Sequence, residues 1–176
     1  MRCIDATTAD CQIFIYKEGL LSSIGHDLKL AVTRFALEID PERLAVKAEF
    51  DSASLRVSSA MKDGQEAPHL LNAADRRNIE HTIATEVLAA GSYPQILFAS
   101  TEIIAAGGGS SFDIKGRLTL HGRTRELRCS ANATSDRLLT EVVLHQPDYG
   151  IRPYSALLGT LRIRQNITVH LSLPRW

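Results

Sequence analysis

The stretch Phe112–Ala133, FDIKGRLTLHGRTRELRCSANA, decides the fold class of this 176-residue chain. From residue 112 to residue 120, polar residues alternate with an apolar set that includes one glycine: Phe112, Ile114, Gly116, Leu118 and Leu120. A period of two puts this set on one face of a strand, as in an antiparallel strand that covers a core. His121-Gly122 follows and is typical of a tight hairpin turn into a second strand over 124–133.

The same alternation is longest near the end of the chain. Between residues 161 and 173, one face holds Gln165 together with six apolar residues: Leu161, Ile163, Ile167, Val169, Leu171 and Leu173. At about 3.3 Å per residue, one unbroken strand here would be roughly 43 Å long. This length is natural for a tilted strand of a barrel.

Weaker alternation predicts five further strands, near 11–16, 28–33, 44–51, 96–100 and 137–145, which makes eight in all. Turn residues separate the strands at Asp40-Pro41-Glu42, Gly107-Gly108-Gly109 and Ser135-Asp136. Closing an antiparallel sheet removes its exposed edges. The expected fold is therefore all-β, an eight-stranded antiparallel β-barrel.

One segment departs from the strand pattern and predicts a helix over 72–90, inserted between two strands. Ile79, Ile83 and Val87 recur at helical spacing, and Asn72 with Asp75 resembles a capping box. Gly91 stands where a left-handed glycine ends a helix. Pro147–Leu158 predicts a shorter irregular or helical turn. No linker or repeat interrupts the chain, so residues 1–176 are interpreted as a single domain.

Composition excludes several classes of function. Twenty Lys and Arg balance twenty Asp and Glu, which argues against a protein that binds nucleic acid or an anionic membrane. No apolar run approaches the roughly 18 residues of a transmembrane helix. The start of the chain lacks the apolar core of a signal peptide, which predicts a cytoplasmic protein, or a periplasmic one if a leader was removed. Three cysteines without a CxxC predict reduced thiols.

The inner face of such a barrel predicts a cavity for a lipid-like molecule. Its walls are aliphatic, only 6% of the chain is aromatic, and Ala48, Gly116 and Ala131 leave room between larger side chains. An apolar tunnel favours a long chain, because each buried CH₂ contributes about 0.8 kcal/mol. The predicted ligand-binding residues of the apolar wall are Leu28, Leu30, Phe98, Gly116, Leu118 and Ile163.

Four polar residues complete the predicted ligand site. Gln165 shares the buried face of the last strand, although a bulge that turns it outward is an alternative reading. Arg152 and Tyr154 are candidates for binding a polar headgroup at the mouth, or for holding their own loop against the barrel. His26, at the start of a strand, is the histidine that we single out as a candidate for a functional role.

Four segments of the chain resemble the YceI-like family. These are Gly25-His26-Asp27-Leu28, Tyr93–Ser100 (YPQILFAS), Lys115–Arg125 (KGRLTLHGRTR) and Asp148-Tyr149-Gly150-Ile151. The resemblance runs from about Gln12 to Leu173. It implies a lipocalin-like antiparallel barrel with a helical insertion and a long pocket for isoprenoids, quinones or fatty-acid derivatives. Members are often periplasmic or stress-associated. The chain departs from the family pattern at residues 75–88, a segment expected to border the cavity.

The function expected from the sequence is a non-enzymatic carrier of one lipid-like molecule, without catalytic residues, metal ion or cofactor. One alternative is an enzyme acting on a lipid, with His26 as general base. Another is a ligand-free scaffold that binds a protein partner through an outer arginine patch, expected at Arg117, Arg123, Arg125, Arg128, Arg162 and Arg164. No HxxxH, HExxH or GxSxG motif is present. A homodimer stays open at this stage.

Overall fold

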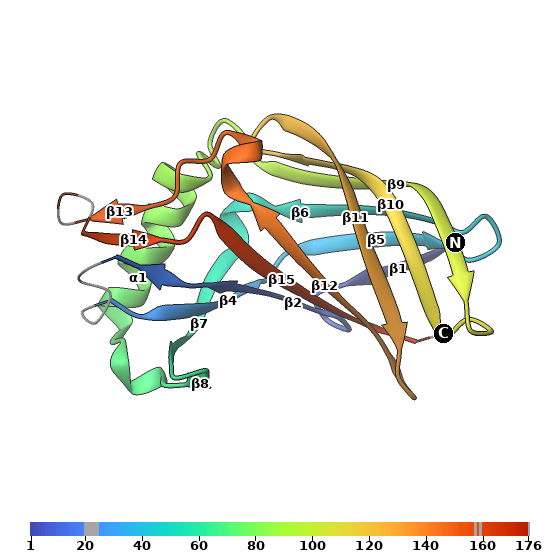
Figure 1. The fold of residues 1–176 in the computed structure, drawn as a ribbon, viewed down its shortest axis with the longest axis horizontal. Coiled ribbons are helices and arrows are strands. Elements are labelled where there is room, and N and C mark those ends of the chain that lie inside the picture. The colour runs from blue at the N-terminus through green and yellow to red at the C-terminus, as the bar shows by residue number, and fades with distance from the viewer. Residues whose placement is uncertain (20–24, 157, 159, 176) are drawn as a thin grey trace.

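The computed structural model describes residues 1–19, 25–156, 158 and 160–175, which form an all-β fold with one short α-helix (Figure 1). The strands are β1 (Arg2–Asp5), β2 (Asp10–Ile15), β3 (Lys17–Glu18), β4 (Asp27–Val32), β5 (Phe35–Asp40), β6 (Ala45–Asp51), β7 (Leu55–Lys62), β8 (Gln65–Glu66), β9 (Gln95–Ala106), β10 (Ser111–Leu120), β11 (Arg123–Ala133), β12 (Arg137–His145), β13 (Ser155–Ala156), β14 (Leu161–Ile163) and β15 (Asn166–Pro174). The helical segments are η1 (Ser52–Ser54), η2 (Pro68–Leu70), α1 (Ala73–Thr82), η3 (Ile83–Val87) and η4 (Gln146–Tyr149).

Twelve of the strands form one strongly curled antiparallel sheet, a half-barrel, in the order β1-β5-β6-β9-β10-β11-β12-β15-β2-β4-β7-β8 (Figure 1). The strands β13, β14 and β3 form a separate small sheet. The expected count of eight strands is therefore not confirmed. The short strands β1, β3, β8 and β13 leave little periodic signal in the sequence. In addition, two long stretches of chain bend, and each bend divides one stretch into two strands, β4 with β5 and β6 with β7.

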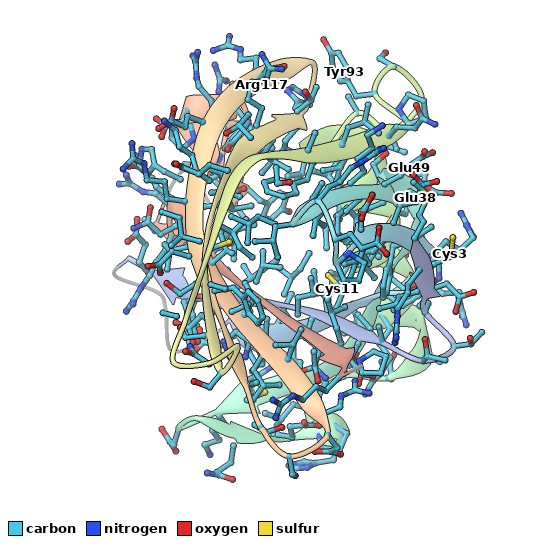
Figure 2. The ribbon with its side chains drawn as sticks, turned by 90° about the vertical axis from the view of Figure 1, so that its right-hand side faces the viewer. Cys3, Cys11, Glu38, Glu49, Tyr93 and Arg117 are labelled. Carbon is cyan, nitrogen blue, oxygen red and sulfur yellow. The ribbon has the colours of Figure 1, made fainter. Side chains whose placement is uncertain are left out.

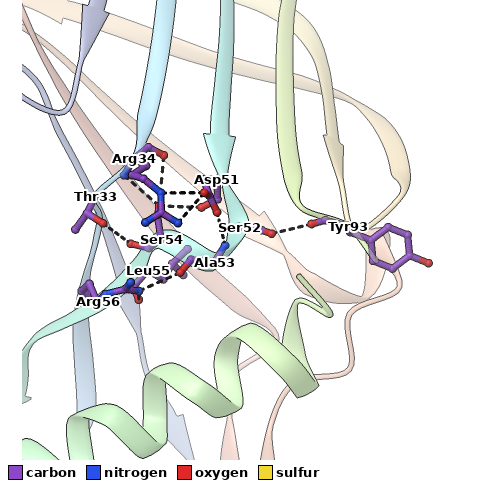
Figure 3. Close-up of polar contacts among 9 residues, drawn as sticks. All are labelled: Thr33, Arg34, Asp51, Ser52, Ala53, Ser54, Leu55, Arg56 and Tyr93. Carbon is purple, nitrogen blue, oxygen red and sulfur yellow. Dashed lines mark hydrogen bonds and ion pairs between the residues drawn. The ribbon is translucent and has the colours of Figure 1, made fainter. Parts of the chain in front are cut away.

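Both bends lie at one polar corner, where β4 continues as β5 and β6 continues through η1 as β7 (Figure 3). The buried Ser54 hydroxyl accepts the N–H of Arg34 at 3.1 Å and donates to the carbonyl of Asp51 at 2.8 Å. Both Nε and Nη2 of Arg34 donate to Oδ2 of Asp51, at 2.9 and 2.7 Å. The Ser52 hydroxyl donates to the carbonyl of Tyr93 at 2.7 Å. The corner thus ties the two bent stretches to each other and to the approach to β9.

The decisive hairpin is confirmed. β10 and β11 pair antiparallel from Ser111↔Asn132 to Leu120↔Arg123, and the turn between them has positive φ at both His121 (51°) and Gly122 (71°). This is the backbone geometry that two-residue hairpins favour. On β10, Gly116, Leu118 and Leu120 are buried on the concave face, as the alternation predicts.

The register corrects the expected outer arginine patch. Arg123 lies opposite Leu120, and Arg125 opposite Leu118, so both share the concave parity of β11 rather than the convex one. Arg125 donates from Nε to the carbonyl of Asp148 in η4, at 3.1 Å. These two side chains therefore face η4 and do not join a continuous outer patch.

The prediction of one long strand over 161–173 is wrong. The chain leaves the small sheet after β14 and joins the half-barrel at β15, with a break at Arg164 and Gln165. Gln146 supplies hydrogen-bond donors to the backbone at this break. Its side-chain amide donates to the carbonyl of Arg164 at 3.0 Å, and its backbone N–H donates to the carbonyl of Gln165 at 2.9 Å. The Gln165 side chain is exposed, as the alternative reading of that residue has it.

The helix exists, but it is shorter than the predicted segment 72–90. The capping box is confirmed: the Asn72 side chain accepts the N–H groups of Ala74 and Asp75, at 2.7 and 2.9 Å. The α-helix ends at Thr82 and continues as the π-helical turn η3. Ala89, with φ of 46°, takes the left-handed position expected at Gly91. Among the described residues, no helix is long and apolar enough to cross a membrane.

Candidate functional site

The curled sheet encloses one large cavity of about 780 Å³. Ten strands of this sheet contribute to its lining: β2, β4, β5, β6, β7, β9, β10, β11, β12 and β15. Figure 2 views the half-barrel from one end and shows Cys11 inside the curl, whereas Cys3, Glu38 and Glu49 lie on its outer side. At roughly 30 Å³ for each water-sized group, the cavity has room for on the order of 25 heavy atoms.

Period-two alternation explains why the lining is apolar. On β15 the lining residues are Ile167, Val169, Leu171 and Leu173, and on β12 they are Leu138, Thr140, Val142 and Leu144. Each set follows one parity of its strand, so a single face of the sheet supplies the wall. Aliphatic side chains dominate this face, which therefore offers dispersion contacts and few hydrogen bonds.

The helical segment completes the wall. Ile79 and Ile83, from α1 and η3, line the cavity beside residues of the sheet. The helix is held to β7 by polar bonds: Glu80 accepts the N–H of Val57 at 2.8 Å, and Arg76 donates to the carbonyl of Val57 at 2.9 Å. β7 has an extra residue at this point, Ser58, and its carbonyl also accepts from Arg76, at 2.8 Å. The helix thus satisfies the backbone groups of an interrupted ladder.

Polar lining residues gather beside the small sheet. The Lys17 Nζ donates to the carbonyl of Gly25 at 2.6 Å, next to His26, which also lines the cavity. β3 and β14 place Lys17 opposite Ile163, and the N–H of Ile163 donates to the carbonyl of Tyr154. Tyr154 and Arg162 line the cavity here as well, so the placement of Arg162 in an outer arginine patch is corrected. We call Lys17, His26, Tyr154 and Arg162 the polar mouth.

An acidic residue lies beside the β5–β6 turn. Asp40 lines the cavity together with Pro41 and Leu44. The backbone N–H of Arg43 donates to the Asp40 carboxylate and is the main cause that lowers its pKa, and the N–H of Glu42 acts in the same direction. This part of the lining therefore carries a carboxylate, in contrast to the lysine and arginine of the polar mouth.

Two thiols, Cys11 and Cys129, face the cavity. Burial raises the pKa of Cys11 to about 12 and raises that of Cys129 as well. Both are therefore neutral thiols near pH 7, which act as small apolar wall residues rather than nucleophiles. Among the described residues, no group of three His, Cys, Asp or Glu side chains is arranged to hold a metal ion.

Six of the ten predicted ligand residues line the cavity: His26, Leu28, Phe98, Leu118, Tyr154 and Ile163. Leu30, Gly116, Arg152 and Gln165 are not part of the lining.

A separate structural reason keeps these four residues out of the cavity lining. Leu30 is fully covered by neighbouring core side chains. A Cβ on Gly116 would meet the Phe98 ring at 2.4 Å, so the ring fills the space that the glycine was expected to open. Arg152 and Gln165 are exposed.

Sequence reasoning missed Lys17 and Gln146, although a signal for both was present. Lys17 continues the parity of Cys11, Ile13 and Ile15, and Gln146 continues that of β12 beyond its last strand residue. Extending each alternation by two residues would have found both. The helical lining residues carried a signal too, since Ile79 and Ile83 are the apolar positions that predict the helix.

The fold and the cavity define a class of protein in which one curled antiparallel sheet encloses a long apolar cavity. Within this class the chain belongs to the YceI-like family, because the model of the YceI-like domain matches residues 17–174. No curated protein sequence matches the chain significantly.

Solved structures show the same fold. BcnA of Burkholderia cenocepacia is 13% identical with a TM-score of 0.66, over 98% of this chain and 99% of that one. A polyisoprenoid-binding domain from Saccharophagus degradans is 9% identical with a TM-score of 0.63, over 97% and 94%. The YceI protein of Campylobacter jejuni is 11% identical with a TM-score of 0.54, over 85% of each chain. At such identities the likeness concerns the fold.

Proposed function

We propose that this protein binds and carries one long-chain, predominantly apolar molecule, such as an isoprenoid, a quinone or a fatty-acid derivative. The cavity of about 780 Å³ with its aliphatic wall carries the proposal. A tail of about sixteen carbons would gain roughly 13 kcal/mol from burial, before the costs of association are subtracted. The similarity to a domain described as polyisoprenoid-binding supports the same class of ligand.

The polar mouth would hold the head of the ligand. Lys17, His26, Tyr154 and Arg162 all carry hydrogen-bond donors. Donors favour a head rich in acceptors, such as a carboxylate, a quinone carbonyl or a phosphate. The tail would then run along the wall of the half-barrel, away from the small sheet.

Binding without chemical conversion fits the wall better than catalysis does. The buried thiols are neutral, and every buried side-chain nitrogen or oxygen among the described residues already has a hydrogen-bond partner. Groups that are already hydrogen-bonded in this way stabilise the fold and are not available as a general base or nucleophile. The ligand is therefore expected to leave the protein unchanged.

Titration with a dansyl-labelled fatty acid tests this function. The expected result is saturable binding of one probe per chain, with the blue-shifted emission of a dye tail in an apolar site, and displacement by unlabelled long-chain acids or isoprenoid alcohols. Mass spectrometry of the recovered probe is expected to show it unaltered, also with His26→Ala. Absence of saturable binding would contradict the proposal, and conversion that His26→Ala abolishes would favour an enzyme instead.

A further inference from the structure

The wall of the half-barrel contains a seam between β11 and β12. The two strands share a turn but pair only at Ala131↔Thr140, Asn132↔Leu139 and Ala133↔Leu138. Beyond these three pairs, β11 continues back to Arg123 and β12 continues to His145, and Figure 1 shows the two strands diverging. Over this length, no backbone hydrogen bond joins the facing edges among the described residues.

The seam separates two complete ladders. β11 pairs with β10 over ten residue pairs, and β12 pairs with β15 over nine. Each ladder is continuous, whereas three pairs next to a turn join one to the other. With three pairs, against four between β2 and β4, this is, in the described part of the chain, the least-paired junction between the strands of the large sheet that line the cavity, so the fewest backbone hydrogen bonds oppose its opening.

The seam leads directly to the apolar interior. Leu127 and Cys129 line the cavity from β11, and Val142 and Leu144 line it from β12. On the convex side, Val143 beside the seam is 56% exposed. The convex face of β11 carries the ion pair of Arg128 with Glu126, so an apolar chain that crosses the seam would pass beside Val143 to the apolar side chains inside.

The wide end of the seam is covered by η4 and the two residues after it, a segment that we call the strap (146–151). Tyr149 and Ile151 are its buried apolar residues. The strap is held to β11 by the bond from Arg125 Nε to the carbonyl of Asp148. It also lies close to Arg123, since a Cβ on Gly150 would come within 2.6 Å of the Arg123 Nε.

We propose that the long-chain ligand enters and leaves the cavity laterally, through the seam between β11 and β12, with the strap as the adjustable cover of its wide end. This inference rests on the proposed carrier function. A lateral route lets a flexible chain pass into the cavity along its length, whereas passage through an end requires threading. Because a route changes the barrier equally in both directions, it governs loading and release rates and not the equilibrium affinity.

A reversible bridge across the seam tests the proposal. In the register that continues the three pairs, Arg128 would lie opposite Val143, and both are exposed on the convex face. The test variant is Arg128→Cys with Val143→Cys. Its matched control is Asn132→Cys with Leu139→Cys, exposed residues that are already directly paired. All proteins, including the reference, carry Cys3→Ser, whereas Cys11 and Cys129 are kept because burial raises the pKa of both thiols.

Each pair is bridged with a bis-methanethiosulfonate, and loading of the dansyl-labelled fatty acid is followed by stopped flow. The bridge in the test variant is expected to slow loading at least tenfold, with recovery after reduction. The control bridge is expected to leave the rate unchanged. Equal rates in both bridged proteins would overturn the lateral route while leaving the carrier function intact. No loading in the reduced or reference protein would refute the carrier function itself.

Loosening the strap gives a second, independent readout. Arg125→Ala removes the bond to Asp148 and is expected to accelerate loading and release severalfold by the same factor, with an unchanged Kd. Arg117→Ala, an exposed arginine on the convex face of β10, is the control and is expected to have no effect. A change in Kd without a change in the loading rate would count against the strap as a cover.

Discussion

Ala48→Phe narrows the cavity at a defined place. Ala48 lies on β6, is 7% exposed and lines the cavity, directly opposite Leu37 on one neighbouring strand and Phe98 on the other. The substitution adds a ring of six carbons to a residue of the cavity wall. The ring therefore occupies volume that the tail of the ligand would otherwise fill.

The magnitude follows from the displaced carbons. With room for on the order of 25 heavy atoms, six fewer shortens the longest accommodated chain by about six carbons. At about 0.8 kcal/mol for each CH₂, a tail that filled the cavity would lose up to about 5 kcal/mol. Partial rearrangement of the tail reduces this to roughly 2–5 kcal/mol, so binding should weaken at least about 30-fold.

A chain-length series provides the assay. Saturated fatty acids of increasing length are used to displace the dansyl-labelled probe, and the length of highest affinity is expected to shift by about six carbons in Ala48→Phe. Ala48→Leu, which adds three carbons, is expected to give about half that shift and guards against misfolding of the larger variant. Ala36→Phe, on the exposed face of β5, is the control. Identical chain-length profiles in all four proteins would refute the assignment of the tail to this cavity.

Three further predictions concern the wall and the corner. Gly116→Ala is expected to lower the free energy of unfolding by about 1–3 kcal/mol in urea denaturation, because the new Cβ would lie 2.6 Å from the backbone oxygen of Ala99; an unchanged midpoint would contradict this. At pH 8, iodoacetamide is expected to modify the exposed Cys3 and to spare Cys11, whose pKa is about 12, as peptide mass spectrometry would show; equal labelling would argue against the burial of Cys11. The hydrogen bond from Arg34 is the main cause that lowers the pKa of Asp51, so this carboxylate stabilises the fold at pH values above its ordinary pKa of 3.8. The contribution is lost as the pH falls through the lowered pKa. Thermal unfolding should therefore show that Asp51→Asn is less stable than the original protein at pH 7 and loses less stability as the pH falls below about 4. An equally large loss of stability below pH 4 in both proteins would count against the pairing.

Local alternation predicts faces well and connections poorly. The parity of 112–120 and of 137–145 identifies which side chains point inward, because it depends only on the pleat of one strand. The bends at Thr33–Arg34 and at η1 could not be predicted in this way, because no Gly or Pro marks them. They depend on the contacts of Ser54 and Asp51 with Arg34, which lies in the other bend and is 17 to 20 residues away in sequence.

The site was predictable to a similar extent. Leu28, Phe98 and Leu118 follow from parity alone, whereas the exclusion of Leu30 depends on how neighbouring core side chains cover it. Gln165 was placed inward by extending one strand across a break that only the change of sheet reveals. The seam depends on where pairing between two strands stops, which no pattern within either strand records.

Native mass spectrometry of the purified protein, followed by organic extraction, tests the central claim most directly. The account predicts a stoichiometric adduct of one molecule per chain, with an isoprenoid, quinone or acyl mass that is recovered intact in the extract. A bare polypeptide mass from several expression hosts, together with no uptake of long-chain molecules offered to the protein, would contradict it.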